Sequence, residues 1–107
     1  MKSKNEILDL LRKYKHTAKS KYGVTRIGIF GSIARNEHND KSDIDVVYEG
    51  EPNILFRSRI KSDLEALFGC RVDVVRYRKQ LADTIFGKEI QKDLIMVWTH
   101  QSEYIFY

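Results

Sequence analysis

Two aspartates separated by a single residue are the part of this sequence best suited to chemistry. Asp43 and Asp45 flank Ile44 at the start of an apolar run, and a Gly31-Ser32 pair ends the apolar run before it. If the second run is a strand, its side chains alternate between faces, so both carboxylates point the same way. Two carboxylates beside a glycine turn are suited to holding a divalent cation over a phosphate.

A third carboxylate, Asp73, lies inside another apolar run, residues 72–75. An unpaired carboxylate buried there would cost several kcal/mol, and the same holds for Asp45. A single such aspartate is more often a strand-end residue that points to solvent. Three of them, on two strands expected to be neighbours, favour a shared divalent cation. Mg²⁺ accepts one or two carboxylates plus substrate phosphates, and a pair of ions would activate an attacking hydroxyl and stabilise the departing oxygen.

The hydrophobic pattern predicts the elements that position these residues. Apolar residues at steps of three and four, with a Ser3/Glu6 capping box and Gly23 as a stop, indicate a first helix. The expected helices are 4–22, a short turn at 32–35, a helix of about four turns capped by Asn53 and ended by Gly69, and 79–92; the expected strands are 24–30, 43–48, 71–77 and 94–98.

This order predicts an α/β (α+β) fold with a small mixed β-sheet of about four strands and helices packed on one face. The strands that carry Asp45 and Asp73 are joined through a helix, which favours a right-handed crossover and parallel neighbours. The loop between the first two strands is compatible with either direction.

Composition narrows the class of protein. The chain has 107 residues, 42% hydrophobic and 32% charged, which predicts one globular domain over residues 1–107. A formal charge of +4, spread along the chain, indicates no dedicated nucleic-acid surface. Cys70 is the only cysteine, and no run approaches the roughly 20 apolar residues that span a bilayer. We therefore expect no membrane association and a cytoplasmic location.

Gly31-Ser32, Asp43-x-Asp45 and a later Asp73 together resemble the active-site motif of the DNA polymerase β-like nucleotidyltransferases. The surrounding residues 30–35 and 42–46 resemble the minimal nucleotidyltransferase (MNT) subfamily, and the similarity extends from Val24 to Trp98. It implies a polymerase β palm-like fold. It also implies that Gly31 and Ser32 bind the β- and γ-phosphates of ATP, and that Asp43, Asp45 and Asp73 are the catalytic carboxylates and ligands of two Mg²⁺ ions.

Two neighbouring residues need comment. Arg35 suits a nucleotide phosphate and a salt bridge within the loop equally well, so both roles stay open. The family usually has glycine at the position of Asn36. Because asparagine tolerates the left-handed conformation better than most residues, we expect the turn to survive.

Stand-alone MNT proteins commonly pair with HEPN-domain proteins as antitoxin and toxin, so the resemblance implies AMP transfer from ATP to a tyrosine of a HEPN toxin. Two alternatives remain: neutralisation by binding and occlusion without catalysis, and transfer to a small molecule or an RNA end. The aromatic-rich run 98–107 could dock a partner or fold over its own core, with neither favoured.

Overall fold

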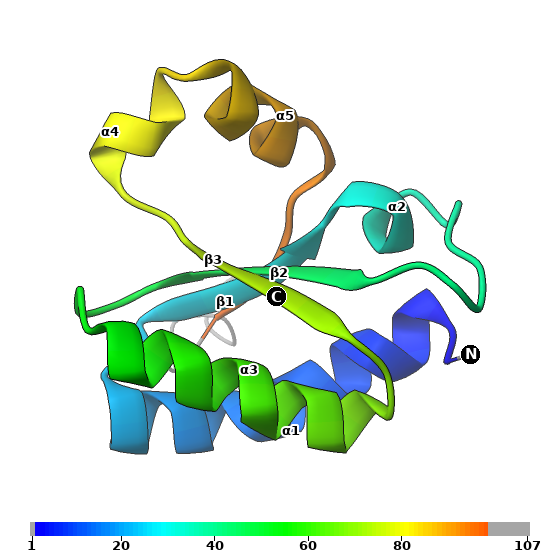
Figure 1. Cartoon of the computed structure of the whole chain (residues 1–107), viewed down its shortest axis with the longest axis horizontal. Coiled ribbons are helices and arrows are strands. Elements are labelled where there is room, and N and C mark those ends of the chain that lie inside the picture. The colour runs from blue at the N-terminus through cyan, green and yellow to red at the C-terminus, as the bar shows by residue number, and fades with distance from the viewer. Residues whose placement is uncertain (1, 99–107) are drawn as a thin grey trace, which may run out of the picture.

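The computed structural model describes residues 2–98 and shows helices interspersed with strands along the chain (Figure 1). The elements, in order, are α1 (Lys4–Tyr22), β1 (Arg26–Phe30), α2 (Gly31–Ala34), β2 (Ile44–Glu49), α3 (Ile54–Phe68), β3 (Val72–Arg76), α4 (Lys79–Ala82), α5 (Ile85–Asp93) and β4 (Ile95–Trp98). Of the aromatic-rich run 98–107, residues 99–107 lie outside the described residues, so whether the run docks a partner or its own core stays open.

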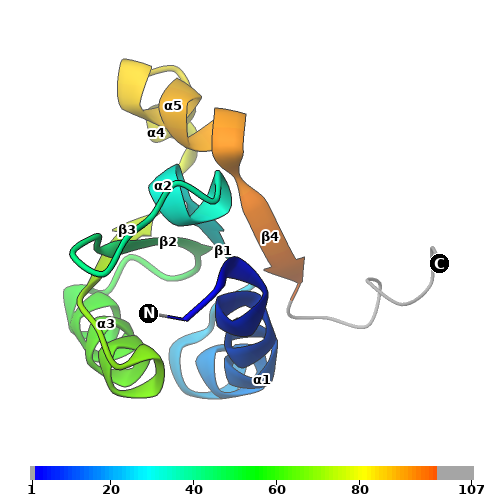
Figure 2. The same cartoon turned by 90° about the vertical axis from the view of Figure 1, so that its right-hand side faces the viewer.

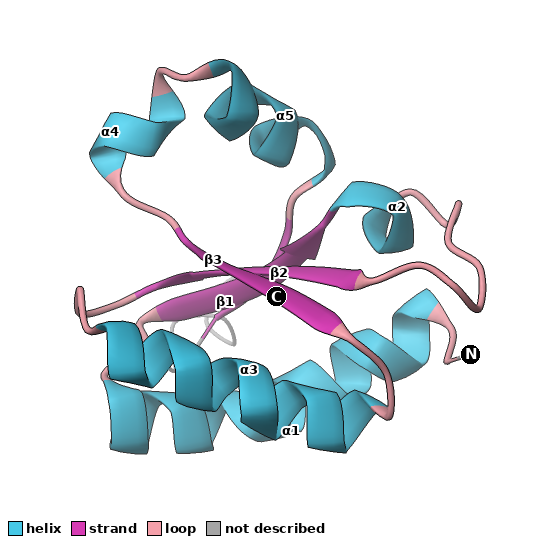
Figure 3. Cartoon of the chain, viewed as in Figure 1, coloured by secondary structure: helices cyan, strands magenta, loops and turns pink. Residues whose placement is uncertain are grey.

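The strands, coloured magenta in Figure 3, form one sheet. It has four strands in the order β3-β2-β1-β4. β1 pairs antiparallel with both β2 and β4, whereas β2 and β3 are parallel. The mixed sheet and the parallel pair are as predicted. The parallel pair follows from its connection, since α3 carries the chain back along the sheet before β3 begins.

The long helices α1 and α3 lie side by side against one face of the sheet (Figures 1 and 2). Alternate strand residues enter the core there, including Ile44, Val46, Val72 and Val74. Both helices begin and end as their sequences predict. Ser3 and Glu6 form the capping box of α1, Asn53 caps α3, and glycines in the left-handed conformation terminate both helices.

A shared carboxylate also joins the two long helices. Tyr14 and Tyr22 of α1 both donate their hydroxyl hydrogens to Oδ2 of Asp63 on α3, at 2.7 and 3.1 Å. Burial and the Asp63 carboxylate raise the pKa of Tyr14 above its usual range, so the hydroxyl stays a donor. The contact fixes the register of α1 against α3.

The shorter helices α2, α4 and α5 lie on the other side of the sheet (Figure 2). The prediction of helices on one face therefore describes α1 and α3. A smaller core of Phe30, Val47 and Ile90 fills the opposite side. No helix within residues 2–98 is long and apolar enough to cross a membrane.

The prediction of a single helix over 79–92 is wrong. The chain breaks between α4 and α5, where the Thr84 hydroxyl accepts a hydrogen bond from the Gly87 N–H at 3.0 Å and caps α5. Gly87 lies so close to the Leu81 carbonyl that a Cβ there would overlap it. This close approach lets α5 fold back beside α4.

Candidate active site

Gly31 and Ser32 follow directly from the end of β1 and form the first turn of α2. Gly31 has a φ of +71°, which side chains disfavour. Two backbone hydrogen bonds close the turn, from Arg35 N–H to the Gly31 carbonyl at 3.2 Å and from Glu37 N–H to the Ser32 carbonyl at 2.9 Å. The structure thus forms the predicted glycine turn at the end of the inner strand β1.

Asp45 lies directly beside this turn. It pairs with Phe30 across the antiparallel β1/β2 ladder, and its Oδ2 occupies the space that a Cβ on Gly31 would need. Its register partner in the parallel strand β3 is Asp73. Because Ile44 and Val46 point into the main core, Asp45 points to the opposite face, where α2 also lies. Residues distant in sequence therefore meet at one point.

The environment of Asp45 raises the pKa of its carboxyl from 3.8 to about 6. Partial burial is the largest cause, followed by the negative charges of Asp73 and Asp43, and the positive charge of Arg35 opposes them. A bound cation would offset the burial and the like charge together. The chemistry of Asp45 therefore fits a hard cation held between carboxylates and phosphates.

Asp43 precedes β2 and forms an ion pair with Arg71, with Oδ1 and Nε 3.3 Å apart. Its charge reaches Asp45, as the raised pKa shows. Within residues 2–98 no three His, Cys, Asp or Glu side chains are gathered into a group that could hold a metal ion. Asp43, Asp45 and Asp73 remain the predicted protein ligands of Mg²⁺. Oxygens of the substrate phosphates would supply further ligands.

The expected burial of Asp73 is wrong, because its side chain is exposed. β3 is an edge strand, and Asp73 faces away from the core that receives Val72 and Val74. Of Asp45 and Asp73, Asp45 alone therefore bears a desolvation cost. An exposed carboxylate beside Asp45 is open to a molecule that approaches from the edge of the sheet.

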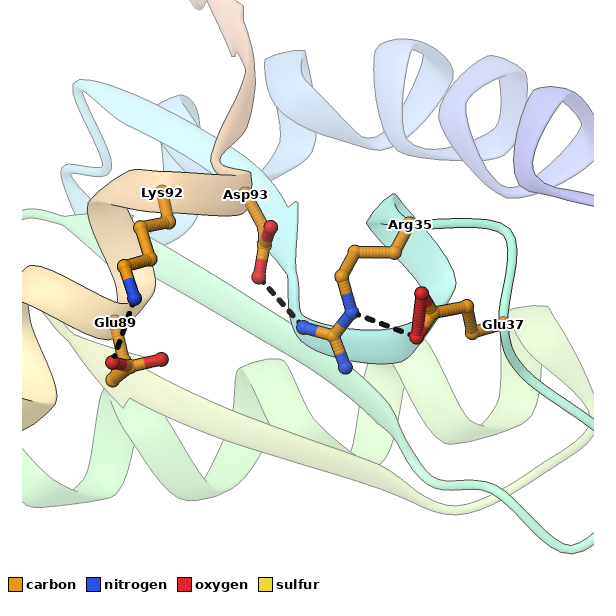
Figure 4. Close-up of polar contacts among 5 residues, drawn as sticks. All are labelled: Arg35, Glu37, Glu89, Lys92 and Asp93. Atoms are coloured by element: carbon orange, nitrogen blue, oxygen red, sulfur yellow. Dashed lines mark hydrogen bonds and ion pairs between the residues drawn. The ribbon is translucent and has the colours of Figure 1, made fainter.

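Arg35 ends α2 and forms ion pairs with two carboxylates (Figure 4). Its Nε lies 3.1 Å from Glu37 Oε2, and one terminal nitrogen lies 2.6 Å from Asp93 Oδ2 at the end of α5. Of the two roles left open by the sequence, the structure shows the salt bridge. The next residue, Asn36, has a φ of +60°, which confirms that asparagine adopts the left-handed turn.

Two basic side chains near Asp73 were not predicted from the sequence to belong to the site. A cavity of about 220 Å³ is lined by Asp73 together with Arg57 and Lys61 of α3. The Nε of Arg57 donates to the Val74 carbonyl at 2.9 Å, which ties α3 to β3. The spacing of four residues between Arg57 and Lys61 places both on one helix face and could have indicated this side of the site.

The chain is similar in sequence to known proteins. The nucleotidyltransferase domain family matches residues 11–102. A predicted protein adenylyltransferase of Methanocaldococcus jannaschii is 42% identical over 99 residues, which cover 91% of this chain and all of the relative. The protein adenylyltransferase MntA of Thermococcus cleftensis is 38% identical over 94 residues, covering 86% of this chain and 93% of the relative.

Solved structures have the same fold. A predicted minimal nucleotidyltransferase superposes with a TM-score of 0.64 at 29% identity, over 84% of this chain and 92% of that one. A complex of a tri-AMPylated Shewanella oneidensis HEPN toxin with an MNT antitoxin gives a TM-score of 0.55 at 21% identity, over 95% of this chain and 74% of that one. At the lower identity the likeness shows the fold alone.

The fold and the site define a small nucleotidyltransferase of the polymerase β-like type. The chain belongs to the nucleotidyltransferase domain family, and within it the MNT resemblance is confirmed.

Proposed function

We propose that this enzyme transfers AMP from ATP to a hydroxyl, a tyrosine side chain, of a HEPN-domain toxin and thereby acts as its antitoxin, with Mg²⁺ as the cofactor. The observation that carries the proposal is the contact of the Asp45 carboxylate with the Gly31 turn. A cation held by this carboxylate would lie next to the phosphates that the turn would hold. We further propose that the chain acts as a single domain in the cytoplasm, where ATP is available.

Each site residue has a distinct task in this proposal. The backbone of Gly31 and the hydroxyl of Ser32 hold the β- and γ-phosphates. Asp43 and Asp45 would hold Mg²⁺, which when bound neutralises the triphosphate and polarises the α-phosphorus. The acceptor oxygen forms a bond to the α-phosphorus as the bond to the pyrophosphate oxygen breaks, and Asp73 takes the hydroxyl proton. The exposure of Asp73 supports this last role.

The names of related proteins support a protein as the acceptor of the AMP group. The Thermococcus protein is a protein adenylyltransferase and matches over nearly its whole length. The Shewanella complex holds a HEPN toxin that carries AMP groups beside its MNT antitoxin. Another related structure is a toxin–antitoxin with AMP-PNP, an ATP analogue. A protein acceptor and an adenine nucleotide are therefore the simplest assignment.

Intact-mass measurement tests the proposal. The purified chain, ATP, Mg²⁺ and a HEPN-domain protein should give a mass gain of one or more AMP groups on the HEPN protein. Asp43→Asn/Asp45→Asn and an excess of EDTA should each abolish the gain. No gain with the wild-type chain, or an undiminished gain with the double variant, would refute the proposal.

Occlusion without catalysis is the second candidate function. It is favoured by large apolar side chains left exposed at the starts of α3 and α5, namely Ile54, Leu55, Ile85 and Phe86. Under occlusion, the Asp43→Asn/Asp45→Asn variant would still suppress the toxin at one equivalent. Under catalysis, the variant would lose suppression, and catalytic amounts of wild type would suffice.

A further inference from the structure

A second and larger cavity, of about 500 Å³, opens at the end of β2 and β3 that lies away from Gly31. We call it the basic–apolar cavity. Its lining combines arginines with apolar and aromatic side chains, principally Arg57, Arg76, Arg78, Ile54, Phe86 and Tyr48. Nothing in the proposed chemistry at Gly31 and Asp45 uses these residues.

The arginines of this cavity are available to bind an anionic ligand. Arg57 donates to the Val74 carbonyl at 2.9 Å and Arg76 donates to the Gly50 carbonyl at 3.3 Å. Arg78 is exposed. Within the described part of the chain, none of the three forms an ion pair with a carboxylate. Three guanidinium groups around one cavity favour an anion that can accept several hydrogen bonds.

The environment of Tyr48 also favours a ligand that accepts hydrogen bonds. Its side chain is only 1% exposed, it lines the cavity, and its hydroxyl has no hydrogen-bond partner among residues 2–98. A buried hydroxyl without a partner is unusual and calls for an acceptor atom. The carboxylate that would satisfy the arginines would also supply that acceptor.

The apolar side of the cavity favours a polypeptide over a free anion. Ile54 is 79% exposed and Phe86 is 48% exposed, although both line the cavity. Side chains of this kind at a concave surface are typical of protein contacts. Ile54 and Arg57 also line the smaller cavity that contains Asp73, so the two cavities adjoin.

We propose that the basic–apolar cavity docks the segment of the acceptor protein that carries the modified hydroxyl, by means of an acidic side chain and an apolar neighbour on that segment. The inference rests on the proposed function for the identity of the acceptor. Asp73 and Arg76 both belong to the edge strand β3, and the cavities that they line share Ile54 and Arg57. The acidic side chain therefore lies within a few residues of the modified hydroxyl.

Binding measured without transfer tests the docking surface. The HEPN-domain protein of the mass experiment is titrated against the Asp43→Asn/Asp45→Asn chain, with and without Arg78→Glu. We expect Arg78→Glu to weaken binding by about 30-fold, the loss typical of an arginine hot spot. Lys13→Glu makes the same charge change on α1, which does not line the cavity, and should match the parent.

A second arm identifies the acidic side chain. Acidic residues within a few positions of the modified hydroxyl are changed one at a time to arginine, and one of them should restore binding to Arg78→Glu. Thermal unfolding of each variant checks that it folds. Should Arg78→Glu unfold, Arg78→Gln provides the same test with a smaller expected loss.

Several results would overturn the docking proposal. Binding that is equal in Arg78→Glu and its parent would do so, as would a HEPN protein that fails to bind. Loss of ATP affinity in Arg78→Glu would assign the cavity to the nucleotide, and loss of self-association would assign it to a second copy of the chain. Arginine-dependent binding without any AMP transfer would retain the docking surface and refute only the proposed function.

Discussion

The carboxylate of Asp45 fills the space that a side chain on Gly31 would occupy. Gly31 lies in the turn after β1 and Asp45 lies in β2, with a long polar loop between them. Glycine is therefore required at position 31 for two independent reasons: the left-handed backbone conformation and the contact with the carboxylate. The turn proposed to bind phosphates and the carboxylate proposed to bind Mg²⁺ are thereby held beside each other.

Replacement of Gly31 should reduce both stability and transfer. For Gly31→Ala we expect a loss of about 2–4 kcal/mol in the free energy of unfolding, from backbone strain plus a displaced side chain. Transfer activity should fall further than stability explains, because the displaced group is the predicted Mg²⁺ ligand. Urea unfolding and the intact-mass assay measure the two effects.

Gly69 offers a matched control for this variant. It has nearly the same backbone conformation, with φ at +72°, but a Cβ there would meet no atom within 4 Å. Gly69→Ala should therefore lose only the strain energy, about 1–2 kcal/mol, and keep transfer activity. Equal losses of stability and activity in the two variants would show that the contact with Asp45 is unimportant.

The raised pKa of Asp45 makes a prediction about stability and pH. The folded chain holds this pKa at about 6, above the ordinary 3.8, so folding favours the protonated form. Asp45 therefore does not reduce stability below about pH 4, and its destabilising effect grows between about pH 4 and 6 and is complete above that.

Asp45→Asn should remove this pH dependence while it abolishes transfer. In EDTA at pH 7.5 we expect the variant to be more stable by about 1 kcal/mol, a value reduced because solvent reaches much of the side chain. The gain should vanish at pH 3.5. Thermal unfolding at the two pH values measures it, and a variant less stable than wild type at pH 7.5 would contradict the assigned cause.

Arg35 and Asp93 should behave as one unit in nucleotide binding. Their ion pair joins α2 to α5 in the structure, so Arg35→Gln and Asp93→Asn should loosen the same contact and change ATP affinity equally. Isothermal titration with ATP and Mg²⁺ on both variants and the double variant measures this. A loss of ATP affinity in Arg35→Gln alone would show instead that Arg35 binds a phosphate.

The tyrosine pair on Asp63 should contribute to stability and not to transfer. Tyr14→Phe removes a hydrogen bond to the half-buried carboxylate of Asp63. We expect the free energy of unfolding to fall by about 1.5–3 kcal/mol, with unchanged AMP transfer. Tyr77→Phe, which removes an exposed contact with Gln91, should change stability by less than about 0.5 kcal/mol. Similar effects in the two variants would show that Asp63 does not tie α1 to α3.

Local patterns determined much of this structure. The bounds of α1, the caps of α3 and the Gly31-Ser32 turn follow from residues within a few positions of each other, and all were predictable. Gly31-Ser32, Asp43-x-Asp45 and Asp73 together also resemble the nucleotidyltransferase motif, and the family match confirms the reaction class that this resemblance implies. Such features depend on backbone propensity and short-range hydrogen bonds, which the sequence encodes directly.

Tertiary packing decided the rest. The helix expected over 79–92 breaks because the Gly87 backbone approaches Leu81, an approach that hydrophobic periodicity does not report. Asp73 is exposed because β3 is at the edge of the sheet, and strand order is a property of the whole chain. The arginines of the basic–apolar cavity come from α3, β3 and the segment that follows it.

By itself the sequence determined the family, because its motif residues lie close together along the chain, and it supplied a set of candidate carboxylates on one strand face. Only the tertiary structure decided that Asp45 is pressed against Gly31 while Asp73 is open at the sheet edge beside the cavities. The physical reason is that burial and electrostatic environment depend on the neighbours that folding brings together from distant parts of the chain.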